Sequence, residues 1–299
     1  MIGTAEIIRR ARQAGIVVPA FNIPYLPMAQ PVIRAVADED SFALVQVARL
    51  EWEKFGSRSL EAVAEEFHRH EDPEHVRLHL DHVPVIDEDR KEVDYLPIIR
   101  RAIAAGYQSV MVDGSRLSLE ENIRATRAVA ELAHAAGIPC EAELGAVLGH
   151  EEGPLPPYEE LFASGRGFTD PAEATRFVAE SGCDWLSVAI GNIHGAISRA
   201  ARDQKKVEAR LNLEQLSKLA GATGVPLVLH GGSGIRPEDV RRAFALGIAK
   251  INVGAEIRQA YEAAWSETGS EEKARDAVYR RTRALLAETY RITGSRARL

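Results

Sequence analysis

The chain has 299 residues, of which 45% are hydrophobic and 27% are charged, and this composition fits a soluble globular protein. Its formal net charge is −7, and no run of Lys and Arg gives the footprint of a nucleic-acid-binding protein. No stretch reaches the roughly 18 apolar residues of a membrane span, and the N-terminal segment lacks the apolar core of a signal peptide. We therefore expect a cytoplasmic protein with neither a nucleic-acid nor a membrane partner.

In chain order, an amphipathic helix is expected over residues 1–15, and short apolar runs then alternate with helical patterns. Near-continuous apolar runs are typical of parallel strands that are covered on both faces. The eight candidate strands are 15–22, 42–48, 75–82, 107–114, 138–145, 184–191, 225–232 and 248–254.

Amphipathic helices are predicted over 118–136, 213–220 and 237–246, where Pro237 followed by two acidic residues makes a good helix start. Eight strands that alternate with helices predict an α/β protein with a TIM (β/α)₈ barrel; a doubly wound open sheet is the structural alternative. Length alone would suggest about two domains, but a barrel of this size routinely forms one. We expect a single domain over 1–299, with a C-terminal helical extension at about 270–292.

Two segments interrupt the alternation. Residues 146–170 are too long for a routine connection and contain Gly, Pro and acidic residues, as functional lids often do. Residues 196–211 form a basic insertion, which either supplies anion contacts or is a solvated loop. The two cysteines, Cys140 and Cys183, stand in apolar surroundings and are expected to be core thiols in a reducing compartment.

Polar residues gather where the predicted strands end. Barrel enzymes place their catalytic residues at the carboxyl ends of the strands, so these residues are expected to share one face. The candidates are Asp81 and His82 after the third run, Asp113 after the fourth, Glu143 after the fifth, His194 and Gly195 after the sixth, His230 after the seventh and Asn252 after the eighth.

Three histidines from three different strands, His82, His194 and His230, could surround one ion. Imidazole nitrogens are good zinc ligands, and three protein ligands with an open position make a catalytic site. One such histidine alone would be a structural residue more often than a ligand; three at one rim favour a metal. Because Asp81 and His82 are adjacent, strict alternation would send them to opposite faces, so the strand is expected to end there.

The turn after His230 reads Gly231-Gly232-Ser233-Gly234. Glycines let the backbone approach an anion closely, and the amides before the next helix can hold phosphate. Phosphate sites near the seventh and eighth strands are common in TIM barrels. A simple tight turn is the alternative.

The ordered set of these motifs resembles the class II, metal-dependent fructose- and tagatose-bisphosphate aldolases, and the chain is identified as a divergent member of that family. The resemblance covers most of the sequence. The matching stretches are PAFNI (19–23), HLDH (79–82), VMVDGS (110–115), EAELG (141–145), FTDPAEATRFV (168–178), VAIGNIHG (188–195), VLHGGSGI (228–235) and IAKINVG (248–254).

The resemblance implies a role for each matching residue, and a zinc or other divalent cofactor. His82, His194 and His230 match the zinc ligands, and Asp113 and Glu143 match a second, alternative metal position. Asp81 matches the acid/base for the hydroxyl proton, and Glu151 matches the acid/base for the enediolate carbon. The positions around the ketose phosphate and its monovalent cation are matched by Gly195, Gly231, Ser233, Lys250 and Asn252, and a substrate-side position by Asn22.

Three positions depart from the family's pattern. Ala48 stands where a serine hydroxyl usually meets the enediolate, Ala255 stands where a threonine usually meets the phosphate, and Val83 replaces a common glycine. A lost hydrogen bond to a charged group costs roughly 1.5–3 kcal/mol. These departures indicate either a weakened bisphosphate aldolase or, as we favour, a site for a less phosphorylated substrate.

The leading hypothesis is thus a zinc-dependent aldolase that acts on a ketose (bis)phosphate or a related sugar and assembles as a homodimer or homotetramer. A metal-dependent sugar epimerase or isomerase would use the same enediolate without cleaving a bond. A non-catalytic homologue would keep only the fold. Schiff-base chemistry is not indicated, because the sixth strand ends in Gly191 and Asn192 rather than in lysine, and Lys250 has an ordinary structural interpretation.

Overall fold

In the computed structural model, eight parallel strands form a closed barrel, each hydrogen-bonded to its neighbours in sequence, with β8 paired to β1. The structure describes residues 2–145, 158–192, 209–232 and 234–299. The strands are β1 Val18–Asn22, β2 Ala43–Ala48, β3 Val76–Pro84, β4 Val110–Asp113, β5 Cys140–Leu144, β6 Trp185–Val188, β7 Leu227–Leu229 and β8 Ile248–Val253. The predicted TIM barrel is confirmed, and the open sheet is excluded.

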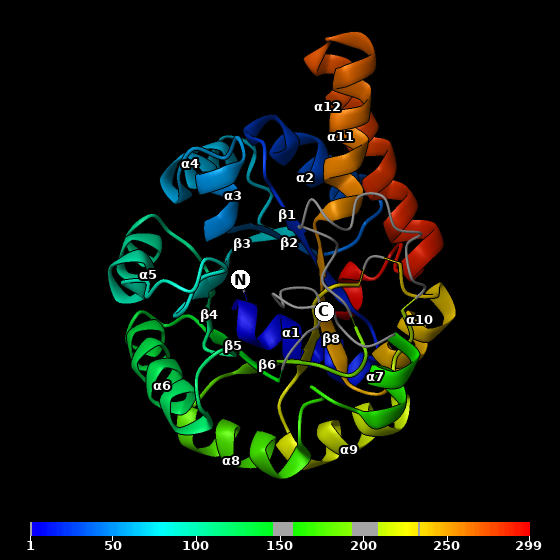
Figure 1. The fold of residues 1–299 in the computed structure, drawn as a ribbon. Coiled ribbons are helices and arrows are strands. Elements are labelled where there is room, and N and C mark those ends of the chain that lie inside the picture. The colour runs from blue at the N-terminus through cyan, green and yellow to red at the C-terminus, as the bar shows by residue number, and fades with distance from the viewer. Residues whose placement is uncertain (1, 146–157, 193–208, 233) are drawn as a thin grey trace.

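Helices surround the barrel (Figure 1). They are α1 Thr4–Ala14, α2 Ala29–Asp38, α3 Arg49–Lys54, α4 Leu60–His70, α5 Tyr95–Ala104, α6 Leu119–Ala135, α7 Tyr158–Ser164, α8 Pro171–Ser181, α9 Leu213–Thr223, α10 Pro237–Ala245, α11 Ala255–Thr268 and α12 Glu271–Ala284. Shorter helical turns are η1 Leu26–Met28, η3 Leu285–Tyr290 and η4 Arg296–Arg298. The predicted helices over 118–136, 213–220 and 237–246 correspond to α6, α9 and α10.

Local sequence explains several helix starts. Ser118 and Glu121 form a reciprocal cap at the start of α6, each side chain accepting the other residue's backbone N–H. At α8, Asp170 is the residue before the helix, and its carboxylate accepts the backbone N–H groups of Ala172 and Glu173. Pro171 occupies the first helical position. Such caps define the residue at which each of these helices begins after the loop that follows a strand.

Two parts of the chain pack outside the regular ring of helices. Helix α1 lies at the N-terminal ends of the strands, where Arg77 at the start of β3 donates to the carbonyl of Ile2. Helices α11 and α12 pack side by side and project beyond the ring (Figure 1). Tyr25, just after β1, stacks on Tyr261 of α11 with ring centroids 5.1 Å apart, so α11 is tied to the end of a barrel strand.

The core is apolar outside the barrel wall but partly polar within it. Buried aliphatic and aromatic side chains of strands and helices form one continuous cluster, and both cysteines lie buried and free, as expected of core thiols. Inside the barrel, by contrast, Gln46, His79, Glu141 and Lys250 are each fully buried. Lys250 pairs with Glu141 and Gln46 donates to Asn22. We refer to these four buried side chains as the polar layer, which lies beneath the carboxyl ends of the strands.

Candidate active site

A bulge in β3 resolves how Asp81 and His82 reach one site. Leu80 pairs with Val110 of β4, but Val83 pairs with Val112, so β3 contains one residue more than β4 over this stretch. A bulge of this kind re-aims side chains without ending the strand. The expectation that the strand ends at His82 was wrong: β3 continues to Pro84, and the bulge brings both side chains to the mouth.

Asp81, His82 and His230 converge, with one ligand atom from each lying within 4.8 Å of the others. The two imidazole rings have centroids 4.5 Å apart. His82, Asp113 and Glu143 form a second group under the same limit. The two groups share His82, so either could hold a cation at the barrel mouth. His194 lies outside the described residues.

His230 is held between two glutamates. Its Nδ1 lies 2.9 Å from Glu143 Oε2 and its Nε2 lies 2.9 Å from Glu141 Oε1, with the imidazole fully buried. Burial opposes protonation, but these two carboxylates prevail and raise the pKa of His230. A carboxylate behind a ligating imidazole fixes the orientation of the ring, and Glu141 is placed to do this.

His82 lies among carboxylates. Its Nδ1 is 3.4 Å from Asp113 Oδ2, and its Nε2 is 4.0 Å from Glu143 Oε2. Burial works against the imidazolium, but the charge of Asp81 and the contacts with Asp113 and Glu143 outweigh it and raise the pKa of His82 to about 10. The mouth therefore attracts positive charge, as a cation site must.

Asp81 accepts hydrogen bonds at both carboxylate oxygens. Asn22 Nδ2 donates to Oδ2 and Asn252 Nδ2 donates to Oδ1, each at 2.9 Å. Burial alone would raise the pKa of Asp81, but the charges of His82 and Lys250 hold it well below its ordinary value. Asp81 is thus an ionised carboxylate in a fixed orientation, beside the two histidines.

Lys250 lies beneath this carboxylate rather than in the mouth. Its Nζ donates to Asn252 Oδ1 at 2.7 Å and forms an ion pair with Glu141 at 2.9 Å, with no exposed side-chain surface. The buried ion pair agrees with the expectation that Lys250 is a structural residue rather than a Schiff-base lysine. From this place Lys250 orients the amide of Asn252 toward Asp81 and pairs with Glu141, which contacts His230.

His79 belongs to the same polar layer, and its imidazole is neutral at ordinary pH. Its Nδ1 lies 2.8 Å from Ser109 Oγ and its Nε2 lies 3.5 Å from Glu141 Oε2. Burial and the charge of Lys250 lower the pKa of His79 to about 3. Because an unfolded histidine takes up a proton near pH 6.5, the unfolded state binds more protons between these values, and the free energy of unfolding falls as the pH drops through this window.

This predicts a pH slope that depends on His79. Between pH 6.5 and 5, the His79 contribution to the free energy of unfolding should fall by about 1.5 kcal/mol. Urea titrations at both pH values should show that His79→Gln loses this part of the slope. The control His70→Gln, at an exposed histidine, should keep the wild-type dependence of the unfolding free energy on pH. If His79→Gln also keeps it, the buried imidazole of His79 does not cause this pH dependence.

The turn after β7 brings glycine backbone close to the mouth. Gly231 has a φ of +65°, which disfavours a side chain there, and a Cβ at Gly232 would lie 2.8 Å from Ile251 Cδ1, so the Ile251 side chain would have to shift. The Asn192 amide donates to the carbonyl of His230 at 2.9 Å and joins the ends of β6 and β7. Glu151, Gly195 and Ser233, like residues 146–157 and 196–208 of the two long segments, lie outside the described residues.

Three side chains around the site were not singled out from the sequence. Glu141 stands two residues before Glu143, and this alternation in a buried strand was a usable signal. Gln46 donates to Asn22 Oδ1 at 2.8 Å. Glu51 accepts from Asn22 Nδ2 at 3.2 Å; its only sequence signal is its place three residues after the end of β2, where an acid can cap a helix.

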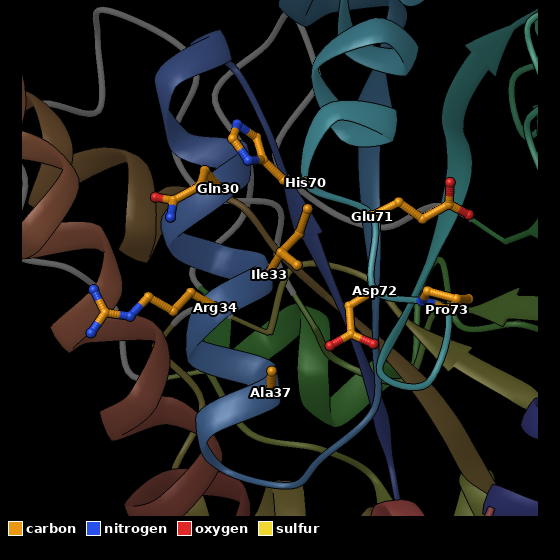
Figure 2. A pocket seen from close by; sticks show the side chains of 8 residues that line it. All are labelled: Gln30, Ile33, Arg34, Ala37, His70, Glu71, Asp72 and Pro73. Carbon is orange, nitrogen blue, oxygen red and sulfur yellow. The ribbon is translucent and has the colours of Figure 1, made fainter.

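Two surface pockets lie elsewhere. Figure 2 shows one of about 360 Å³ between α2 and the end of α4, in which Arg34, His70 and Asp72 are among the lining side chains. A second one, lined in part by Arg77 and His134, is at the N-terminal end of the barrel. Neither includes Asp81, His82 or His230, and both lie away from the carboxyl ends of the strands, where barrel enzymes act.

The geometry agrees with comparisons to known proteins. The family model for class II fructose-bisphosphate aldolases matches residues 2–297. The chain belongs to this family. A relative named "Probable fructose-bisphosphate aldolase" from Bacillus subtilis (strain 168) is 33% identical over 261 residues, which are 86% of this chain and 82% of the relative.

Solved structures resemble this aldolase over nearly its whole length. The YdjI aldolase from Escherichia coli K12 superposes with a TM-score of 0.77 at 29% identity, over 98% of this chain and 100% of that one. A fructose-bisphosphate aldolase from Campylobacter jejuni, at 19% identity and a TM-score of 0.75 over 98% and 96% of the two chains, shares the fold.

Family membership makes this protein an aldolase, a carbon–carbon lyase, and confirms the resemblance drawn from the motifs. Within the described ranges, none of the helices is long and apolar enough to cross a membrane.

Proposed function

We propose that this aldolase is zinc-dependent and reversibly cleaves and forms a carbon–carbon bond in a ketose phosphate. The observation that carries the proposal is the convergence of Asp81, His82 and His230 within 4.8 Å at the barrel mouth. Two imidazoles beside a fixed carboxylate provide both a metal site and a proton acceptor.

The donor set fits a divalent metal. His82 and His230 would be ligands, with Glu141 orienting the His230 ring from behind, and His194 is proposed as the third ligand. Asp113 and Glu143 would serve the alternative position that shares His82. When bound there, the cation would act as a Lewis acid and stabilise the negative charge that develops on the ketone oxygen as the bond breaks.

Asp81 is proposed to move the hydroxyl proton. Asn22 and Asn252 hold its carboxylate in one orientation, and ionisation leaves it ready to accept a proton from the hydroxyl at the cleaved bond. In the direction of condensation Asp81 returns this proton. Glu151 is proposed as the acid/base for the enediolate carbon.

The phosphate end of the substrate is proposed to lie over the turn after β7. Gly231 and Gly232 let the backbone approach an anion, and Gly195 and Ser233 are proposed to complete the contacts. Asn252, which Lys250 orients, lies at the end of the adjacent β8, where a monovalent cation is proposed to bind with the phosphate.

We further propose that the preferred substrate has fewer phosphate contacts than a ketose bisphosphate requires. Ala48 lies at the end of β2, in register with Asp81, and Ala255 begins α11 directly after β8. Neither side chain can donate a hydrogen bond. Each missing bond to a charged group would cost roughly 1.5–3 kcal/mol, or about 10- to 150-fold in kcat/KM.

Assays on a panel of ketoses test this function. Zinc-loaded enzyme should release aldehyde from a ketose monophosphate with a higher kcat/KM than from the matching bisphosphate, and chelation should remove the activity until zinc is restored. Epimer formation without aldehyde release would contradict the proposal. A clear preference for the bisphosphate would contradict only the substrate choice.

The organisation of the whole protein remains a prediction. We propose a single barrel domain over 1–299 that functions in the cytoplasm as a homodimer or homotetramer. Sedimentation equilibrium of the zinc-loaded protein would give the number of subunits directly.

A further inference from the structure

The Asn22 amide is fully engaged within the protein. Its Oδ1 accepts a hydrogen bond from Gln46 Nε2 at 2.8 Å, and its Nδ2 donates to Asp81 at 2.9 Å and to Glu51 at 3.2 Å. An amide nitrogen has two N–H groups, and these two acceptors use both. Asn22 is also only 6% exposed, so its orientation is set by its three partners.

Glu51 reaches Asn22 from the short helix α3. One oxygen, Oε2, accepts both the Ala48 backbone N–H at 2.8 Å and the Asn22 Nδ2 at 3.2 Å. The backbone bond fixes the carboxyl at the start of α3, and the second bond turns the Asn22 amide so that its other N–H points to Asp81. Asn22 is therefore the single residue that connects Glu51, by hydrogen bonds, to Asp81, the carboxylate that is proposed to move the proton.

We propose that Glu51 is a positioning residue of the aldolase reaction, which acts by orienting Asn22 and, through it, Asp81. The inference rests on the proposed role of Asp81 and goes beyond it, because it assigns a function to a side chain outside the metal and substrate positions. Its physical basis is that a base held by oriented donors loses less rate to misalignment than a base free to rotate.

The charge state of Glu51 is compatible with this role. Burial and the nearby charge of Asp81 raise the pKa of Glu51 to about 8, although its hydrogen bonds to Ala48 and Asn22 oppose the shift. At neutral pH Glu51 thus acts mainly as a hydrogen-bond acceptor rather than as a second negative charge. A glutamine has an acceptor oxygen at the same place and should replace it.

Three single variants test the proposal in the zinc-loaded enzyme. Glu51→Ala should lower kcat about 10-fold, the effect of one lost hydrogen bond, with little change in KM. Glu51→Gln should restore kcat to near the wild-type value. The matched control Glu53→Ala removes an acid on the same helix that pairs with Arg49, and should leave kcat unchanged. An equal loss in the alanine and glutamine variants would overturn the proposal.

A double variant separates positioning from helix capping. Since Glu51 also caps α3, its removal could act on the fold alone. If it acts through Asn22, Asn22→Ala with Glu51→Ala should have the same kcat as Asn22→Ala. A further 10-fold loss in the double variant would overturn the proposal.

Nuclear magnetic resonance of the Asn22 side-chain amide gives a readout without turnover. Its two N–H protons give separate signals because rotation about the amide C–N bond is slow, and the signal of the proton that faces Glu51 should move upfield, toward that of a free amide, in Glu51→Ala but not in Glu51→Gln. Unchanged signals in Glu51→Ala would overturn the positioning role. If wild type cleaves no ketose, the proposed function fails, whereas the amide signals still decide whether Glu51 orients Asn22.

Discussion

Replacing Asp81 with alanine should lower kcat by roughly 10²- to 10⁴-fold, the usual contribution of a general acid or base, while zinc stays bound. The expected loss is large because both oxygens of Asp81 are fixed by amide donors, Asn22 and Asn252. No other acidic side chain in the described ranges shares both of these donors. Steady-state kinetics and metal analysis on the same preparation give the two quantities.

The outcome also separates two roles for Asp81, since its ligand atoms lie close enough to His82 and His230 to share an ion. If zinc is lost together with activity, Asp81 is a ligand and not the proton acceptor. Asp276→Ala is a suitable control, because that carboxylate is on α12 and pairs with the exposed Arg280. Wild-type cleavage in Asp81→Ala would remove Asp81 from the mechanism.

Replacing His82 with alanine should nearly abolish both zinc binding and cleavage. His82 belongs to both groups of candidate ligands, so its loss disrupts either cation position. The decrease in zinc affinity should exceed the roughly 10- to 100-fold that the loss of an outer partner costs. Competition with a fluorescent chelator measures this affinity without any assay of turnover.

Two further variants make the ligand prediction specific. His194→Ala should show the same joint loss of zinc and activity, whereas His134→Ala, at an exposed histidine paired with Asp184, should keep both. Thermal unfolding of each variant would identify a loss due to misfolding. Full zinc content and turnover in His82→Ala would contradict a metal site at the β3 end.

Much of the fold follows from local patterns in the sequence. Seven of the eight apolar runs each contain one strand of the barrel, the third run contains all of β3 but its last two residues, and the predicted helix over 118–136 is α6, Leu119–Ala135. Strand runs and helical periodicity are properties of neighbouring residues, so they can be recognised without a partner. Once a parallel barrel is predicted, its topology brings all carboxyl ends to one mouth, which is why His82, Asp113 and His230 could be grouped before the structure was known.

The details of the site depend on contacts between distant residues. The bulge in β3 exists only in relation to the register of β4, and no alternation within the HLDH motif reveals it. Glu51 meets Asn22, 29 residues away, and Asn22 meets Asp81, 59 residues away. Such pairings are set by the closure of the barrel, and single-sequence periodicity carries no information about them.

The sequence by itself determined the barrel and the face at which the candidate site residues gather, because these follow from hydrophobic periodicity and parallel topology. Only the tertiary structure decided that Lys250 lies buried against Glu141, that both oxygens of Asp81 are fixed, and that Glu51 joins this network. The reason is that a buried polar group needs a partner, and which partner it finds depends on which strands the closed barrel places side by side.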